Sequence, residues 1–237
     1  MTYKIKNILS WYNKYNKLDV IISTHNNKFE LELSSKQISH LIGVHYTLNK
    51  DNKITGKQLY NYIKNKSDEQ IYSLIKKNNP RELNDVKERI NNFKYFMENL
   101  ESATLYEQTH KNTKIKSIFL LVKKEDNSYL QLGIAKNRNY TDYLETFLVR
   151  KDNNYIKNSK IKEKVISIET YNEQDELIPF SFNEEKNKKL LEEYYKNKNN
   201  QNKQKTFKEK LEEKLTTKQK EKEKNLTTKE KNINIEK

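Results

Sequence analysis

The sequence lacks several residue types and patterns, and each absence excludes a class of protein. It contains no cysteine, which excludes disulfides and thiolate metal sites. No apolar run approaches the roughly 20 residues that a membrane-spanning helix needs, and residues 1–18 lack the apolar stretch of a signal peptide. Only three glycines are present, and neither a Walker loop nor a GxGxxG motif occurs. We therefore expect a cytoplasmic protein with no membrane partner and no nucleotide-cradling loop.

Positive charge is the main compositional feature that is present. Lysine and arginine number 47 against 33 aspartates and glutamates, which gives a formal net charge of +14. A polyanion is the natural partner of such a chain, either nucleic acid or an anionic surface. The abundance of Lys, Asn, Ile and Tyr also fits an AT-rich genome, so part of the lysine content reflects composition rather than function.

Hydrophobic periodicity predicts helices first and strands later. Apolar residues at helical spacing predict helices over 3–16 and 57–65, after Ser67, and from Val86 to Leu100. Alternating or β-branched segments predict strands at 20–23, 29–33, 103–108, 115–123, 129–135, 144–150 and 165–170. The first two strands form a hairpin around Asn26-Asn27. The expected fold is α+β, with an N-terminal hairpin and helices packed on an antiparallel meandering sheet.

A change of composition near Asn183 predicts a domain boundary. We expect an α+β domain over residues 1–182, followed by a Lys/Glu-rich tail over 183–237 that is helical or disordered. Within it, residues 198–237 contain thirteen lysines and seven glutamates, and the tetrapeptide LTTK occurs twice. The tail is therefore also a candidate arm for binding a polyanion or a protein partner.

Two histidines flank a glycine turn in the segment FELELSSKQISHLIGVHY (residues 29–46). Ser34 or Ser35 can cap a short helix that ends near Gly43, with His40 before the turn and His45 after it. Imidazole titrates near neutral pH, so this pair is a candidate acid and base beside a phosphate. The alternative is that both histidines only pack or lie at the surface. No HExxH motif or carboxylate triad is present, and we expect no metal site.

A second candidate group lies on the strand YLETFLVRKD (residues 143–152). Alternation places Thr146 and Arg150 on one face, where they can hold a phosphate, and places Glu145 on the opposite face. The alternative is that Arg150 only ends an amphipathic strand and reaches solvent. Further cations that can bind substrate are Lys57, Lys136, Arg138 and Lys151.

The order of these segments resembles a known family of phage nucleases. The segments are SSKQISHLIGVHY, TGKQLYNYIKN, SIFLLVKKEDNSYLQLGIAKN and YLETFLVRKDNNYI, within roughly residues 15–170. They are similar to the fourth family of phage barnase–EndoU–colicin–RelE-like nucleases. The resemblance implies helices before an antiparallel sheet and cofactor-free, metal-independent cleavage of RNA by the ribose 2′-hydroxyl. It assigns His40, His45, Thr146 and Arg150 to the active site.

These observations give one main functional hypothesis and two alternatives. The main hypothesis is a metal-independent endoribonuclease of phage or mobile-element toxin type. It would act on RNA such as tRNA, and an immunity or antitoxin protein is a candidate partner. The first alternative is a non-catalytic nucleic-acid-binding protein of the same fold, whose binding would depend strongly on salt. The second is an interaction protein whose helical tail docks a partner.

Overall fold

The computed structural model describes residues 4–48, 54–111, 117–136 and 141–201. Residues 1–190 form one compact unit, which contains all the elements described here except the last part of the C-terminal helix. Arg138 and both LTTK segments lie outside the described residues, as does the tail beyond residue 201.

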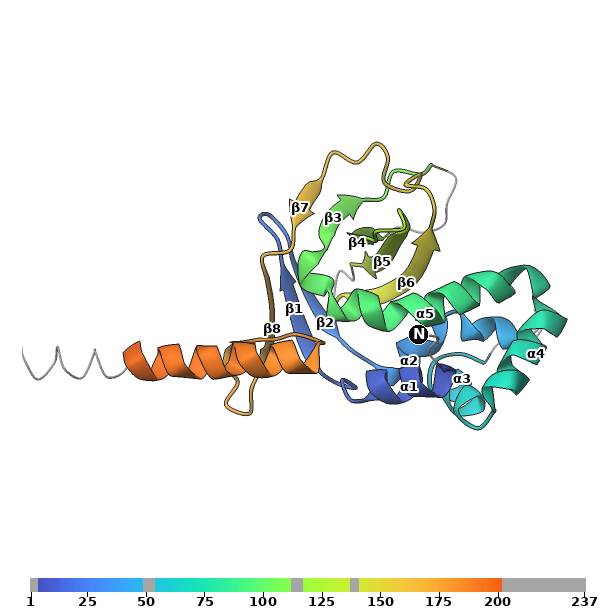
Figure 1. The fold of residues 1–237 in the computed structure, drawn as a ribbon, viewed down its shortest axis with the longest axis horizontal. Coiled ribbons are helices and arrows are strands. Elements are labelled where there is room, and N and C mark those ends of the chain that lie inside the picture. Colours follow the sequence, from blue (N-terminus) through green and yellow to red (C-terminus); the bar gives the residue numbers. More distant parts are fainter. Residues whose placement is uncertain (1–3, 49–53, 112–116, 137–140, 202–237) are drawn as a thin grey trace, which may run out of the picture. The chain divides into compact units, whose positions relative to one another are not determined.

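The helices that precede the five-stranded sheet lie in the first half of the chain, as the sequence predicted (Figure 1). They are α1 (Ile5–Asn13), α2 (Ser35–Leu41), α3 (Gly56–Lys64), α4 (Asp68–Asn78) and α5 (Leu83–Glu98), with the 3-10 turns η1 (Val44–Thr47), η2 (Pro80–Glu82) and η3 (Leu100–Ser102). The starts of α2 and α4 are set by local chemistry. Ser34 with Gln37, and Ser67 with Gln70, form capping boxes in which each pair satisfies two helix-end donors.

The strands form two antiparallel sheets rather than one. The first sheet has the order β2-β1-β8-β9, from β1 (Asp19–Ser23), β2 (Lys28–Glu32), β8 (Ser167–Tyr171) and β9 (Leu177–Pro179). The second has the order β6-β5-β4-β3-β7, from β3 (Thr104–Glu107), β4 (Ile118–Lys123), β5 (Tyr129–Ala135), β6 (Tyr143–Arg150) and β7 (Lys162–Lys164). The α+β class is confirmed, and the predicted meander corresponds to β3–β6.

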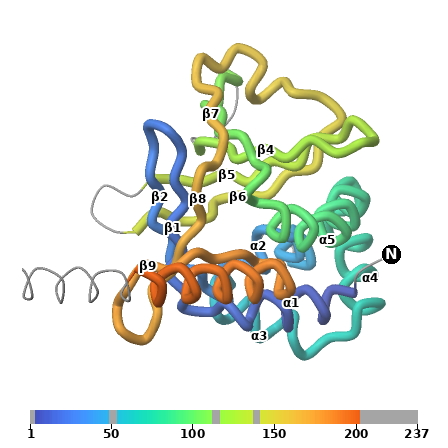
Figure 2. Tube along the Cα trace, turned by 60° about the vertical axis from the view of Figure 1, so that its left-hand side comes forward, coloured from blue at the N-terminus to red at the C-terminus, as the bar shows by residue number. Residues whose placement is uncertain are grey.

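The predicted strand at residues 165–170 is present as β8, but it joins the N-terminal hairpin and not the meander. The chain leaves the five-stranded sheet at Val165, whose N–H donates to Ala103, and the next N–H, from Ile166, donates to Ser23. β8 then pairs along β1, with Ile22 opposite Ile168, and lies beside it in Figure 2. The N-terminal hairpin is thus a part of a second sheet, because β8 supplies it with a partner.

The core lies between the helices and one face of each sheet. It contains Phe93 and Phe96 of α5, which pack edge-on against Phe147 of β6 at 5.2 and 5.5 Å between ring centroids. A smaller cluster lies on the other face of the five-stranded sheet and contains Phe119, Leu121, Leu148 and Ile156. We call it the second cluster. β6 therefore carries core residues on one face and residues of the second cluster on the other.

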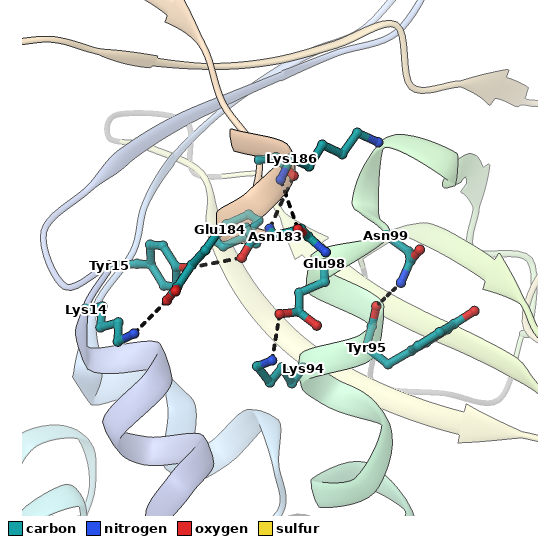
Figure 3. Close-up of polar contacts among 11 residues, drawn as sticks. Lys14, Tyr15, Lys94, Tyr95, Glu98, Asn99, Asn183, Glu184 and Lys186 are labelled. Carbon is teal, nitrogen blue, oxygen red and sulfur yellow. Dashed lines mark hydrogen bonds and ion pairs between the residues drawn. The ribbon is translucent and has the colours of Figure 1, made fainter. Parts of the chain in front are cut away.

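A C-terminal helix begins at residue 184 and is described to residue 201. Its first turn is tied to the preceding residues: Lys14 pairs with Glu184 at 2.6 Å, as Figure 3 shows. Lys186 pairs with Glu101. The sequence predicted a helical or disordered tail from residue 183, and its described part is helical over residues 184–201. No helix among the described residues has the length and apolar character that crossing a bilayer requires.

Candidate active site

Four of the residues predicted to act in catalysis lie around one cavity of about 450 Å³. His40 comes from α2, His45 from η1, and Thr146 and Arg150 from β6. The remaining lining residues are Tyr46, Glu82, Asp85, Arg89 and Leu148. Helical and strand segments that are about 100 residues apart in sequence therefore meet at the edge strand of the five-stranded sheet.

A left-handed glycine brings the two histidines together. Gly43 has a φ of +78°, a conformation that side chains with a Cβ rarely adopt, and it turns the chain from α2 into η1. A Cβ at this position would lie 3.0 Å from Val86 Cγ2 and 3.5 Å from Arg89 Cδ. The turn stacks the rings of His40 and His45 at 4.4 Å, and the ring of Tyr46 follows at 4.1 Å from His45.

Two asparagines at the end of α4 hold the turn that carries His45. The side-chain amide of Asn79 donates to the carbonyls of Tyr46 and Leu48 at 2.7 and 2.9 Å. The amide of Asn78 donates to the carbonyl of Thr47 at 2.5 Å. These bonds satisfy backbone acceptors that η1 leaves unpaired, so the position of His45 depends on α4 as well as on Gly43.

The environment favours neutral histidines in the free protein. Desolvation lowers the pKa of His45 to about 3, helped by the nearby charges of His40 and Arg89, and the carbonyls of Ser39 and His40 only partly oppose this. Desolvation and Arg89 also lower the pKa of His40, while the carboxylate of Glu145 acts in the opposite direction. The two stacked rings therefore differ in how readily they accept a proton.

Arg89 supplies a guanidinium from the helical side of the cavity. Its side chain is 8% exposed, and both Nε and a terminal nitrogen contact Asp85 Oδ2, at 2.8 and 2.6 Å. A buried arginine requires such a partner, since an unpaired buried charge is costly. The pair keeps Arg89 beside the histidines, where the arginine presents its charge to the cavity.

Arg150 supplies a second guanidinium from the sheet side. Its terminal nitrogen donates to the hydroxyl of Tyr155 at 3.1 Å, and the guanidinium lies 5.0 Å from the centre of that ring. Its Nε is buried and has no hydrogen-bond partner among the described residues. Thr146 is 7% exposed and lies two register positions along the same face. Arginine and threonine donors together suit an anion with several oxygens, such as a phosphate.

A β-bulge corrects the expected position of Glu145. The pairing of β5 with β6 passes from Gly133–Thr146 to Ile134–Leu144 and skips Glu145. As a result Leu144 joins Phe147 in the core, and Glu145 turns to accept a hydrogen bond from Ser117. A bulge places two consecutive residues on one side of a strand. Glu145 therefore shares the face of Thr146 and Arg150, contrary to simple alternation.

Three other predicted cations, Lys57, Lys136 and Lys151, do not line the cavity. Lys57 is an exposed residue of α3, Lys136 lies 5.2 Å from the ring of Phe29, and Lys151 faces Asp126 at 3.9 Å. Arg138 lies outside the described residues. Their binding roles stay predictions.

Sequence reasoning missed Arg89 and Tyr46. A signal for Arg89 was present, because it lies within the apolar stripe of α5 beside Val86 and Ile90. An arginine on the buried face of an amphipathic helix, four residues after an aspartate, indicates a paired buried charge. Tyr46 gave no signal beyond its place in the histidine segment. Among the described residues, no group of three or more His, Cys, Asp or Glu side chains is arranged to hold a metal ion.

Comparison with known proteins identified a family. Residues 4–188 match the sequence model described as phage-Barnase-EndoU-ColicinE5/D-RelE like nuclease4. The match covers more than half of the chain, and it confirms the resemblance inferred from the four sequence segments. Searches of curated proteins and of solved structures gave no match.

Proposed function

The chain belongs to the family of phage-Barnase-EndoU-ColicinE5/D-RelE like nuclease4, and from this premise we propose that it is a metal-independent endoribonuclease. The family supports a nuclease function. The observation that supports RNA as the substrate is the convergence of His40 and His45 with two arginines around one cavity. Two imidazoles and fixed cations provide what internal attack by a ribose 2′-hydroxyl requires.

The scissile phosphate would lie between the two guanidiniums. Arg89 approaches from α5 and Arg150 from β6, and the hydroxyl of Thr146 is available on the same side as Arg150. Fixed positive charges stabilise the extra negative charge that the phosphorane carries relative to the diester. Because Arg89 is paired with Asp85 and Arg150 with Tyr155, little reorganisation is needed when that charge develops.

We assign the base to His45 and the acid to His40. His45 is neutral at neutral pH because burial lowers its pKa to about 3, and the charge of a bound phosphate would raise that pKa so that the ring can accept the proton of the 2′-hydroxyl. The 2′-oxygen then bonds to phosphorus, and the bond from phosphorus to the 5′-oxygen breaks. His40 is the better acid because the carboxylate of Glu145 favours its charged form, and it gives its proton to the leaving 5′-oxygen. Bound phosphate would raise the pKa of both rings and so favour the transfer.

The proposed reaction is tested by identifying the end groups of the RNA fragments that it produces. Incubation with a short RNA in EDTA should yield one fragment ending in a 2′,3′-cyclic phosphate and one beginning with a 5′-hydroxyl. The same oligonucleotide with a single 2′-deoxyribose at the cleaved position should resist cleavage there. Cleavage of the 2′-deoxy substrate at an equal rate, or a strict need for a divalent cation, would contradict the proposal.

A further inference from the structure

Gln131 of β5 is fully buried, yet its amide is unpaired. Its exposed fraction is 0%, and neither the amide oxygen nor the amide nitrogen has a hydrogen-bond partner among the described residues. Buried polar groups are nearly always bonded, because leaving them unpaired lowers stability. An amide that is unpaired at both atoms therefore points to a role outside folding.

The register places Gln131 directly behind the wall of the cavity. Its partner on β6 is Leu148, which lines the cavity, and its partner on β4 is Leu121. Residues directly opposite each other in an antiparallel pair share a face of the sheet. The side chain of Leu148 therefore lies between the cavity and Gln131.

The surroundings of Gln131 suit a planar heterocycle. Tyr129 lies two residues before it on the same face and is the register partner of Arg150. Tyr155 lies beneath the guanidinium of Arg150 and packs against Phe119 at 6.0 Å between ring centroids. Aromatic rings stack on nucleobases, and a glutamine amide can bond the donor and acceptor of a base edge at the same time.

We propose that Gln131 reads the base next to the scissile phosphate, an inference that rests on the proposed ribonuclease function. The base would enter past Leu148, with its phosphate held by Arg150. The amide oxygen would accept from an exocyclic amino group while the amide nitrogen donates to a ring nitrogen. Adenine presents this pair of groups, and unpaired cytosine presents it too (N4 amino and N3), so the substrate class is single-stranded RNA with adenine or cytosine at that position.

The test compares Gln131→Leu with the wild type in three measurements. Binding of fluorescent oligo(A), oligo(U), oligo(C) and oligo(G) RNAs is measured in EDTA, cleavage is measured on the same RNAs, and thermal unfolding is recorded. Gln131→Met serves as a second apolar variant of similar volume. The matched control is Leu132→Met on the same strand, whose side chain is buried in the core on the helical face.

The proposal predicts that the wild type prefers adenine and cytosine over uracil and guanine by about 5- to 150-fold. Both Gln131 variants should lose this preference and keep or raise the unfolding temperature, whereas Leu132→Met should keep the preference. The same base profile in wild type and variants, or no base preference in the wild type, would overturn the inference and leave the nuclease proposal standing. If the wild type cleaves none of the RNAs, the proposed function fails, and the binding profiles still decide whether Gln131 reads a base.

Discussion

The protein environment lowers the pKa of His45 more strongly than it lowers the pKa of His40. Burial and two neighbouring positive groups lower the pKa of His45, while Glu145 moderates the same effect at His40. Two residues of one type therefore differ because of what surrounds them, which is the general way in which a protein separates an acid from a base. Because His45 is assigned as the base and His40 as the acid, the dependence of kcat/KM on pH can be predicted.

The pH profile of kcat/KM should lie on the acidic side of neutrality. The alkaline limb reports loss of the proton from His40, whose pKa lies below 6.5, and the acidic limb reports protonation of His45 near pH 3. Removing the carboxylate in Glu145→Gln withdraws a charge that raises the pKa of His40, so the alkaline limb should move to lower pH. Glu30→Gln on β2 is the control. An unmoved limb in Glu145→Gln would disprove the electrostatic link.

Gly43→Ala should lower both stability and activity. A left-handed alanine costs about 1–2 kcal/mol, and its Cβ would also press on Val86 at 3.0 Å and disturb the approach of Arg89. Gly56→Ala is the matched control, because Gly56 also has a positive φ, +53°, but among the described residues its Cβ would meet only Lys36 Cβ, at 3.8 Å. Chemical denaturation and RNA cleavage together separate the two effects. Equal loss of activity in both variants would show that backbone strain alone explains the result.

At the scale of elements, the site depends on junctions rather than on single helices or strands. The end of α4 holds η1, the start of α5 carries Asp85 and Arg89, and a bulge in β6 turns Glu145 toward the site. Junctions can fix the positions of site residues because the ends of helices leave backbone groups unpaired, and these groups form hydrogen bonds to neighbouring segments. A bulge likewise redirects a side chain of its strand.

Asn79→Ala should lower kcat/KM by more than its loss of folding stability explains. It removes two hydrogen bonds to η1, which are worth about 1–3 kcal/mol together. Because the freed turn carries His45, kcat/KM should fall by about 10- to 100-fold. Asn99→Ala is the matched control, since Asn99 ends α5 with one amide bond to the carbonyl of Tyr95, drawn in Figure 3. A stable Asn79→Ala variant with wild-type kcat/KM would show that the two hydrogen bonds from Asn79 do not position His45.

Features that depend on local chemistry were predictable from the sequence. Ser34 or Ser35 was predicted to cap the short helix α2, and Ser34 does; the pattern from Val86 to Leu100 predicted α5, and β5 spans the predicted residues 129–135. The bulge at Glu145, the buried Arg89 and the pairing of β1 with β8 were not predicted. The bulge and the strand pairing depend on contacts between segments far apart in the chain, which hydrophobic period does not specify, whereas the signal for Arg89 lay within α5 and was overlooked. The convergence of the two histidines with Thr146 and Arg150 around one cavity agrees with the hypothesis from the sequence, and their catalytic roles stay predictions.

At the scale of the whole domain, one glutamate links the two sheets. Glu163 of β7 accepts hydrogen bonds from Thr24 Oγ1 at 2.5 Å and from Asn26 N at 3.1 Å, and from the side-chain amides of Asn26 and Asn27. These donors belong to the turn between β1 and β2. They hold the pKa of Glu163 at about 2. The site is built on the five-stranded sheet, so this link bears on folding more than on chemistry.

Acid should weaken the link between the sheets. A lowered pKa means that the ionised Glu163 stabilises the folded state above its ordinary pKa of 4.5, and this stabilisation is lost as the pH falls toward 2. Glu163→Gln should therefore unfold more easily at pH 7 and show a weaker pH dependence between pH 4.5 and 2. Glu173→Gln, at an exposed turn, is the control. Identical dependence in the wild type and Glu163→Gln would contradict this account.

The most direct measurement is cleavage of RNA in EDTA by the wild type, His40→Ala and His25→Ala. His25 lies in the exposed turn between β1 and β2, so its substitution controls for loss of a histidine without loss of the site. The account predicts that the wild type and His25→Ala cleave equally and that His40→Ala is slower by a factor on the order of 10² to 10⁴. Intact RNA with the wild type, or wild-type rates with His40→Ala, would contradict it.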